Sequence, residues 1–190
     1  MISELIIKNR SYRRFHQTEI TRAELKKMVT GARNSASAAN LQRIRYLIVN
    51  DRETVSEIFP TLMFAGYLKE WGGPLPSERP TAYIVLMTEK TPDVNLAIDI
   101  GIAAQSMLLV GAEMGIGGCM IRSFKREELS SVIKVDGYSP ELVIALGHPS
   151  ERVYITDAEN GDIKYYRDGR DDHAVPKLSL DELIIKSQNR

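Results

Sequence analysis

The sequence predicts one α+β domain in which helices flank a central mixed sheet. Three observations support this fold class. Apolar residues recur at helical spacing in several segments, and short apolar runs typical of strands lie between them in irregular alternation. The length of 190 residues suits one core but not two. Residues 150–190 are polar, so within the single domain of residues 1–190 we expect them to form a C-terminal extension or arm, either on the same chain or wrapped around a partner.

Local signals place the helices. The first is expected over residues 2–8, with Ser3 as a candidate cap. Thr21 and Glu24 have the spacing of a capping box and begin the second, which continues with apolar residues at helical spacing. Further helices are expected over residues 52–59, 93–115 and 125–133 and from Leu180 onward, with Gly115 as a left-handed C-cap.

Short apolar runs predict the strands. They are expected at residues 46–49, 83–87, 117–121 and 142–146, with peripheral strands at 153–155 and 163–166. The segment from Phe64 to Trp71 has apolar residues at helical spacing, but Gly72, Gly73 and Pro74 end it in a loop. It forms either a lid over a site or a surface helix that packs through Trp71.

Composition excludes several classes of protein. The 25 basic and 25 acidic side chains cancel, which disfavours nucleic acid or an anionic membrane as a partner. The single cysteine, Cys119, excludes a disulfide framework, and the 3 histidines lack the paired spacing of a metal site. The apolar run of residues 96–118 is interrupted by Asp99, Gln105 and Glu113, which favours a buried helix over a membrane span. We therefore expect a cytoplasmic protein without a metal.

Two segments have residues suited to an anionic, ring-containing ligand. Arg10, Ser11 and Arg13 lie in a basic run, and guanidinium groups beside a hydroxyl suit phosphate oxygens. Residues 35–42 are small and end with Asn40 and Gln42, whose amides suit the polar edge of a ring. Each also has a simpler interpretation, a solvated basic face for the first and a connecting loop for the second.

Two other motifs are weaker. The glycine-rich residues 115–119 follow a helix and precede a strand, the reverse of the order in a dinucleotide-binding motif, so we interpret them as capping and close packing, with Cys119 in the core. In the tail, His173 and Lys177 have a spacing at which they close on an anion if Pro176 makes a turn.

Taken in order, these motifs resemble the nitroreductase family. The family's Arg-Ser-x-Arg-x-Phe stretch matches residues 10–15, and its small-residue loop before a strand matches residues 35–44. The long helix that ends in Gly-Leu-Gly is similar to residues 103–117, the closing strand to residues 142–149, and the Val-Pro-Lys of the tail to residues 175–177.

The resemblance implies a nitroreductase-like fold in an intertwined homodimer, with FMN at the interface and NADH or NADPH as reductant. The reaction it implies is hydride transfer from NAD(P)H to nitroaromatic, quinone or similar electron-poor small molecules by a ping-pong mechanism, in which the flavin and no catalytic side chain carries the chemistry. The alternatives are a flavin-binding carrier or sensor without fast turnover, or another flavin reaction such as reductive dehalogenation.

The resemblance also implies which residues bind the cofactor. The phosphate and the pyrimidine end of the flavin are contacted by Arg10, Ser11, Arg13 and Lys177, with His173 beside Lys177. The flavin is lined from the partner chain by Ala36, Ser37, Ala38, Asn40 and Gln42. The backbone amides of Arg122 and Ser123 lie near the reactive flavin nitrogen. Asn9 and Leu178 stand where many relatives carry arginines, and Ala36, Arg43 and Ile44 replace the usual Pro and Pro-Trp.

Overall fold

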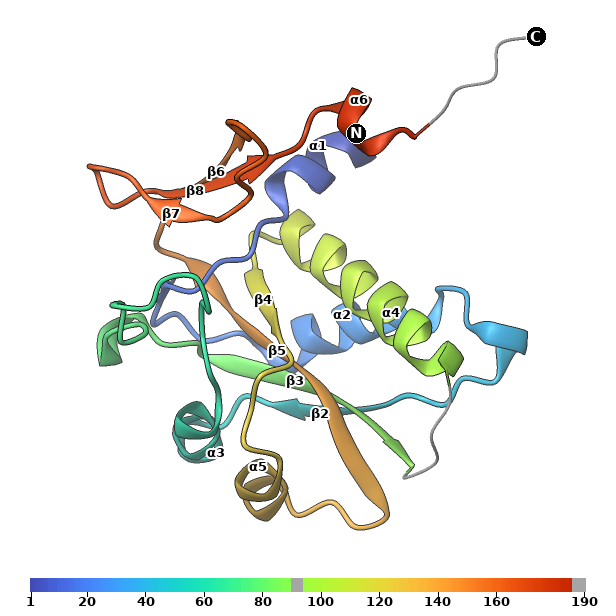
Figure 1. Ribbon diagram of the computed structural model, residues 1–190. Coiled ribbons are helices and arrows are strands. Elements are labelled where there is room, and N and C mark those ends of the chain that lie inside the picture. The colour runs from blue at the N-terminus through green and yellow to red at the C-terminus, as the bar shows by residue number, and fades with distance from the viewer. Residues whose placement is uncertain (90–93, 186–190) are drawn as a thin grey trace, which may run out of the picture. The chain divides into compact units, whose positions relative to one another are not determined.

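The computed structural model describes residues 1–89 and 94–185 of the chain, which divides into two compact units (Figure 1). The first unit comprises Met1–Phe64 and Gly73–Ser150, and the second comprises Ala65–Gly72 and Glu151–Arg190. The start of the polar tail expected at about residue 150 therefore coincides with a boundary between units. That the tail belongs to a single domain as an extension stays a prediction.

The first unit is built on an antiparallel sheet. Its strands are β1 (Phe15–His16), β2 (Arg45–Val49), β3 (Ala82–Glu89), β4 (Gly117–Ile121) and β5 (Tyr138–Pro149), in the order β1-β5-β3-β2 with β4 also paired to β5. The α+β class is confirmed, but the expectation that this sheet is mixed is wrong, because each pair of its named strands is antiparallel. Among the described residues of the first unit, the parallel pairing is the bridge between Ser11 and Gly118.

Helices cover both faces of this sheet (Figure 1). The helices of this unit are α1 (Ile2–Lys8), α2 (Arg22–Arg33), α3 (Arg52–Ile58), α4 (Val94–Glu113) and α5 (Arg126–Ile133), with the short 3-10 turns η1 (Ala38–Asn40), η2 (Phe59–Thr61) and η3 (Pro76–Glu78). Alternate residues of β3 point to opposite faces. Ile84 and Leu86 pack in one core cluster with residues of α2 and α4, whereas Tyr83 and Val85 pack in another with residues of α3 and α5.

The predicted helix boundaries agree with the structure to within one or two residues in the described part of the chain. The Thr21 hydroxyl accepts the amide of Glu24 at 3.3 Å, and the Glu24 carboxylate accepts the amide of Thr21 at 2.8 Å, which confirms the capping box. Ser3 is not the cap of α1, since the N-cap position falls on Met1. Residue 93, the predicted start of the long helix, lies outside the described residues.

Helix α4 is apolar enough, by length and composition, to cross a membrane between Asn95 and Glu113. Core helices of soluble proteins also satisfy this criterion. In this fold Ala103, Ala104 and Met107 are buried in the core cluster that includes α2 and the sheet, whereas Ile98 is exposed, so the expected burial holds for one face of the helix.

The second unit contains a small sheet of β6 (Val153–Asp157), β8 (His173–Lys177) and β7 (Tyr166–Arg167), followed by α6 (Leu180–Leu183). Strand β8 is parallel to β6 and antiparallel to β7. The turn expected at Pro176 is not present, because Pro176 lies inside β8 opposite Thr156. Proline is tolerated there because β7 pairs with β8 only at His173 and Ala174, so that edge of β8 has no strand partner at Pro176.

The segment of residues 65–72 forms turns and no helix. Within the second unit its aromatic side chains contact the tail. The Tyr67 ring lies 4.9 Å from the Tyr165 ring, and the Arg167 guanidinium lies 5.3 Å from the centre of the Trp71 ring. Arg167 in turn forms a buried ion pair with Glu151 at 2.6 Å. This segment therefore packs through its aromatic residues, and its role as a lid stays a prediction.

Candidate functional site

The segment with Arg10, Ser11 and Arg13 lies in extended conformation beside β4. Helix α1 ends at Lys8, since Asn9 has extended backbone angles. Ser11 then forms its bridge with Gly118, and the Tyr12 amide donates to the Gly118 carbonyl at 3.2 Å. The β4 strand thus fixes the position of the predicted phosphate-binding residues.

Arg10 has an unsatisfied donor in this segment. Its Nη2 donates to the Ile6 carbonyl at 2.5 Å, whereas its buried Nε has no hydrogen-bond partner among the described residues. Leaving a buried donor unpaired costs about 1–3 kcal/mol, and more when the group is charged. Arg13 reaches the Ser11 carbonyl at 3.1 Å with Nη1. A bound anion at Arg10 would supply the missing acceptor.

The loop of residues 35–42 connects α2 to β2 and has an unusual backbone. Ala39, Asn40 and Gln42 have φ angles of 47°, 54° and 48°, in the left-handed region. This region costs a residue with a Cβ atom about 1–2 kcal/mol, and such conformations concentrate at ligand sites. The simple interpretation as a connecting loop does not explain three left-handed residues in four positions without a glycine.

Helix α4 contacts the first half of this loop through two hydrogen bonds. The Ala38 amide donates to Oδ1 of Asp99 at 2.9 Å, and the hydroxyls of Ser35 and Ser106 are 2.7 Å apart. Within the loop, the Gln42 amide donates to the Ser37 hydroxyl at 3.4 Å. Asp99 is only 5% exposed, so this carboxylate belongs to the interior of the protein and not to its surface.

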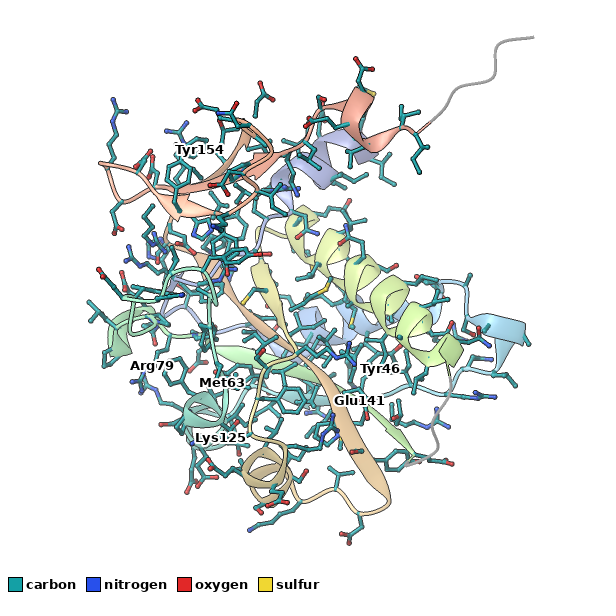
Figure 2. All side chains as sticks on the ribbon, viewed as in Figure 1. Tyr46, Met63, Arg79, Lys125, Glu141 and Tyr154 are labelled. Carbon is teal, nitrogen blue, oxygen red and sulfur yellow. The ribbon has the colours of Figure 1, made fainter. Side chains whose placement is uncertain are left out.

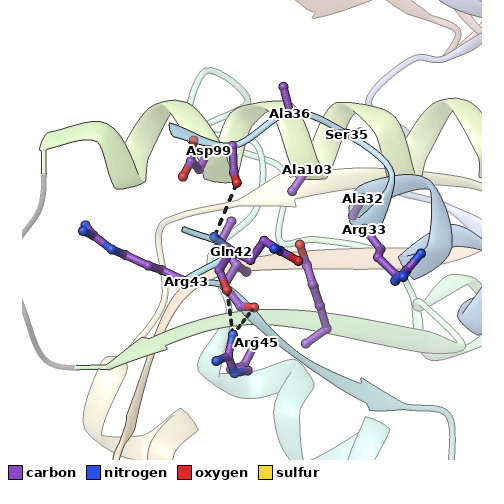
Figure 3. Close-up of a pocket in the computed structure, with 12 residues that line it drawn as sticks. Ala32, Arg33, Ser35, Ala36, Gln42, Arg43, Arg45, Asp99 and Ala103 are labelled. Carbon is purple, nitrogen blue, oxygen red and sulfur yellow. Dashed lines mark hydrogen bonds between the residues drawn. The ribbon is translucent and has the colours of Figure 1, made fainter. Parts of the chain in front are cut away.

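A cavity of about 290 Å³ lies behind the loop (Figure 3). Its lining includes three of the predicted site residues, Ala36, Ser37 and Gln42. The other lining residues are Ala32, Arg33, Ser35, Arg43, Ile44, Arg45, Tyr46, Asp99 and Ala103.

Polar side chains form part of the lining of this cavity. Burial raises the pKa of Tyr46, and the negative charge of Asp99 raises it further. Figure 3 shows Arg45 beneath the loop, where it donates to the Gln42 carbonyl at 2.7 Å. Sequence reasoning missed Asp99 as a site residue, although a lone acid inside an apolar helix was the available signal.

Arg122 and Ser123 follow the last residue of β4 and are exposed. The Ser123 carbonyl accepts the Met63 amide at 2.9 Å, and the Lys125 amide donates to the Thr61 carbonyl at 2.8 Å. Figure 2 labels Met63 and Lys125 on these segments. Because β4 also contacts Ser11 through Gly118, one strand positions both predicted groups.

His173 and Lys177 occupy the two ends of β8 in the second unit. Lys177 lies four positions after His173 along the strand, which places them roughly 13 Å apart, so the two side chains do not close on one anion as the expected turn required. His173 is 1% exposed, with its ring 5.1 Å from that of Tyr165. The predicted role of Lys177 at a phosphate stays a prediction.

Within the first unit, the two groups of predicted residues lie toward opposite ends of α4. The loop contacts Asp99 near its start, whereas Lys8, Asn9 and Tyr12 line a small cavity together with Ala112 at its end. Thirteen helical residues separate Asp99 from Ala112, which corresponds to roughly 20 Å. One chain therefore does not bring the loop and the arginines to the same ligand.

Comparisons with known proteins agree with this fold. The model of the nitroreductase family matches residues 6–148. A protein of Archaeoglobus fulgidus, to which NADH dehydrogenase/NAD(P)H nitroreductase activity is attributed, is 25% identical over 166 residues, covering 83% of this chain and 90% of the relative.

Solved structures show the same fold at low identity. A nitroreductase family protein from Streptococcus pneumoniae has a TM-score of 0.71 at 17% identity, over 98% of this chain and 100% of that one. The NADPH:FMN oxidoreductase from Vibrio harveyi, solved with NAD+, has a TM-score of 0.67 at 21% identity, over 100% and 78%. An FMN-dependent nitroreductase from Clostridium difficile has a TM-score of 0.63 at 22% identity, over 83% and 91%. Because the family model covers most of the chain and the fold agrees, this protein belongs to the nitroreductase family.

Proposed function

We propose that this protein is an FMN-dependent oxidoreductase that passes hydride from NADH or NADPH to small electron-poor acceptors such as nitroaromatics and quinones. Family membership supports the class of reaction. The observation that carries the cofactor assignment is the buried Nε of Arg10, which lacks a hydrogen-bond partner among the described residues beside the Ser11–Gly118 bridge. A phosphate ester is an anion that a guanidinium group binds well.

We propose that the working form is a homodimer. The loop and the Arg10 segment lie roughly 20 Å apart along α4, so the loop of one chain is available to complete the site of another. Among the described residues of the first unit, no element covers the outer side of α4, since Ile98 and Ile102 are 61% and 36% exposed. A second copy that covered this apolar surface would bury both side chains.

The residues of the chain have binding and electrostatic roles in this proposal. Arg10 and Ser11 hold the phosphate, and Arg13 places a positive charge near the pyrimidine ring, where it favours the anionic reduced form because opposite charges attract. The flavin, when bound, supplies the capacity to accept and return a hydride. The left-handed loop contributes a rigid surface of small residues. Nothing in this scheme requires a side-chain acid or base. The single cysteine fits a reducing compartment, and we propose the cytoplasm.

The first test is a visible spectrum of the purified protein, followed by titration with FMN if the protein is colourless. A flavin spectrum that NADH or NADPH bleaches, and that a quinone or nitroaromatic restores repeatedly, supports the oxidoreductase. Bleaching without turnover supports a carrier or sensor, and turnover only with a halogenated aromatic supports reductive dehalogenation. A protein that binds no FMN at excess contradicts the proposal.

Arg10→Ala tests the residue that carries the assignment. We expect the Kd for FMN to rise about 10- to 100-fold, because a hydrogen bond to a charged group contributes about 1.5–3 kcal/mol. Arg52→Ala, which removes the same charge from an exposed position at the start of α3, is the matched control and is expected to leave the Kd unchanged. Equal Kd values for the two variants would remove Arg10 from the site.

A further inference from the structure

We propose that Asp99 is a positioning residue that holds the loop of residues 37–42 in its ligand-ready conformation, through the hydrogen bond from the Ala38 amide. This inference rests on the proposed function, because it names the group that prepares the loop for the flavin. Asp99 lies on α4 and is assigned no direct contact with the cofactor.

The burial of Asp99 shows that its carboxylate has an interior role. At 5% exposure it has lost most of its hydration, and a buried carboxylate is tolerated only when hydrogen bonds replace the lost water. The Ala38 amide, at 2.9 Å, is one such donor. A hydrogen bond to an ionised acceptor is about twice as strong as one between neutral groups.

The position of this bond explains why it matters for the loop. Ala38 immediately precedes Ala39 and Asn40, two of the left-handed residues. Without a tether, residues with a Cβ atom relax toward right-handed or extended angles, because the left-handed region costs each about 1–2 kcal/mol. The carboxylate fixes the start of the strained stretch, and the Ser37 hydroxyl, which accepts the Gln42 amide at 3.4 Å, contacts its end.

A second hydrogen bond from α4 provides a matched control. The Ser106 hydroxyl contacts Ser35, which also reaches the Gly31 carbonyl and so belongs to the end of α2. Ser106→Ala therefore removes one polar contact between the same helix and the same part of the chain but leaves the Ala38 amide bonded. If any loss of α4 contacts weakened the site, Ser106→Ala and Asp99→Ala would have similar effects.

The substitutions separate hydrogen bonding from charge. Asp99→Ala removes the acceptor, whereas Asp99→Asn removes the charge and keeps an oxygen acceptor of the same shape. We expect Asp99→Ala to raise the Kd for FMN at least 10-fold, Asp99→Asn to raise it by a smaller factor because it keeps a weaker, neutral hydrogen bond, and Ser106→Ala to stay within about threefold of the wild type.

Hydrogen exchange of the flavin-free proteins gives a readout that a merely stabilising residue would not affect. In Asp99→Ala the amides of residues 38–42 should exchange at least 10-fold faster, with the amides of β3 unchanged. Asp99→Asn and Ser106→Ala should exchange like the wild type in this loop. Faster exchange throughout the protein in Asp99→Ala would indicate general destabilisation and would contradict the proposal.

Ala38→Pro removes the donor of the same bond and covers the case in which Asp99→Ala fails to fold. Proline suits this place, because Ala38 is the first residue of η1 and Ser37 before it is extended, with φ −137° and ψ 153°. Where Asp99→Ala folds, Ala38→Pro and Asp99→Ala, each alone and combined, form a double-mutant cycle for the bond. If the bond positions the loop, Ala38→Pro alone raises the Kd at least 10-fold, and combining it with Asp99→Ala adds little.

The outcomes distinguish this inference from the proposed function. If the wild type binds FMN and neither Asp99→Ala nor Ala38→Pro changes loop exchange or the Kd, the positioning role is wrong while the function stands. If the loop loosens without a change in Kd, the role in cofactor binding is likewise wrong. If the wild type binds no FMN, the proposed function fails, and loop exchange alone then tests whether Asp99 holds the loop.

Discussion

Two segments of small residues occur in the first unit, and the fold accounts for one and not for the other. In residues 115–119, Gly115 has a φ of +77° at the end of α4, and a Cβ at Gly118 would lie 2.4 Å from the Ala145 carbonyl oxygen. In residues 35–42 there is no glycine, yet the backbone at Ala39 and its neighbours is left-handed. Packing and capping explain the glycine-rich segment completely.

The contrast shows where to look for function in a sequence of this kind. A glycine in a tight or left-handed place relieves a requirement of the fold, so it carries little information about ligands. A left-handed residue with a side chain retains a cost that something else must offset. In this protein the offset comes from the buried Asp99, and the remaining justification for the loop is the ligand that we propose.

The largest expected effect comes from Gly118→Ala. Its Cβ would overlap the backbone of β5, where no flexible side chain can move aside, and we expect a loss of about 3 kcal/mol in the free energy of unfolding. Denaturant unfolding measures this loss. Gly169→Ala is the control, because no atom lies within 4 Å of its Cβ position. A loss below 1 kcal/mol for Gly118→Ala would show that packing does not explain this glycine.

Alkaline pH should lower the free energy of unfolding through two tyrosines. Tyr83 packs in one cluster with Cys119 of the glycine-rich segment, and Tyr46 lines the cavity beside the loop of residues 35–42. Burial raises the pKa of Tyr83, with a further contribution from Cys119, and burial and Asp99 raise that of Tyr46. A raised folded-state pKa means that the folded protein holds the phenol proton more tightly than the unfolded chain does. The stabilisation is therefore complete below about pH 10, the ordinary tyrosine pKa, and is lost as pH rises toward the folded-state value.

The slope should approach about 1.4 kcal/mol per pH unit for each such tyrosine, measured by denaturant unfolding between pH 9 and pH 11. Tyr83→Phe should flatten this dependence. At neutral pH it should cost little, because the Tyr83 hydroxyl is buried without a hydrogen-bond partner among the described residues. An unchanged alkaline slope in Tyr83→Phe would contradict the assignment.

Gly115→Ala isolates the conformational requirement at the end of α4. Nothing lies within 4 Å of the Cβ position, so the cost comes from the left-handed backbone alone, at about 1–2 kcal/mol. For a chain of this size we expect the melting temperature to fall by about 2–4 °C per kcal/mol. A variant as stable as the wild type would show that this position tolerates another conformation.

Ala39→Gly makes the reverse exchange and should have the smallest effect. Glycine removes the left-handed cost but adds chain entropy to the unfolded state, so we expect a net gain of about 0.5 kcal/mol in the free energy of unfolding. FMN affinity should fall slightly, because the freer loop loses more conformational entropy when it becomes ordered on binding. A clear loss of stability would mean that the conformation of Ala39 is not strained, and the contrast between the two segments would disappear.

The sequence by itself predicted the elements whose formation depends on residues close together in the chain. The Thr21–Glu24 box, the left-handed Gly115 and the apolar runs of β2, β3 and β4 each depend on neighbours within a few positions. Family motifs in the right order then identified the nitroreductase family. The short β1 and β8 were missed, because two-residue pairing and a strand that contains Pro176 have no local signature.

The tertiary structure decided the strand order and the contacts around the loop, since these depend on residues far apart in the chain. The antiparallel order of the sheet follows from how β3, β4 and β5 meet, and not from the pattern within any strand. Likewise, the Ala38 amide and Asp99 are 61 positions apart, so no spacing rule connects them. The sequence by itself determined the family and the candidate residues, whereas only the fold showed that a buried carboxylate on α4 accepts a hydrogen bond from the loop, because burial and strain arise when distant segments pack.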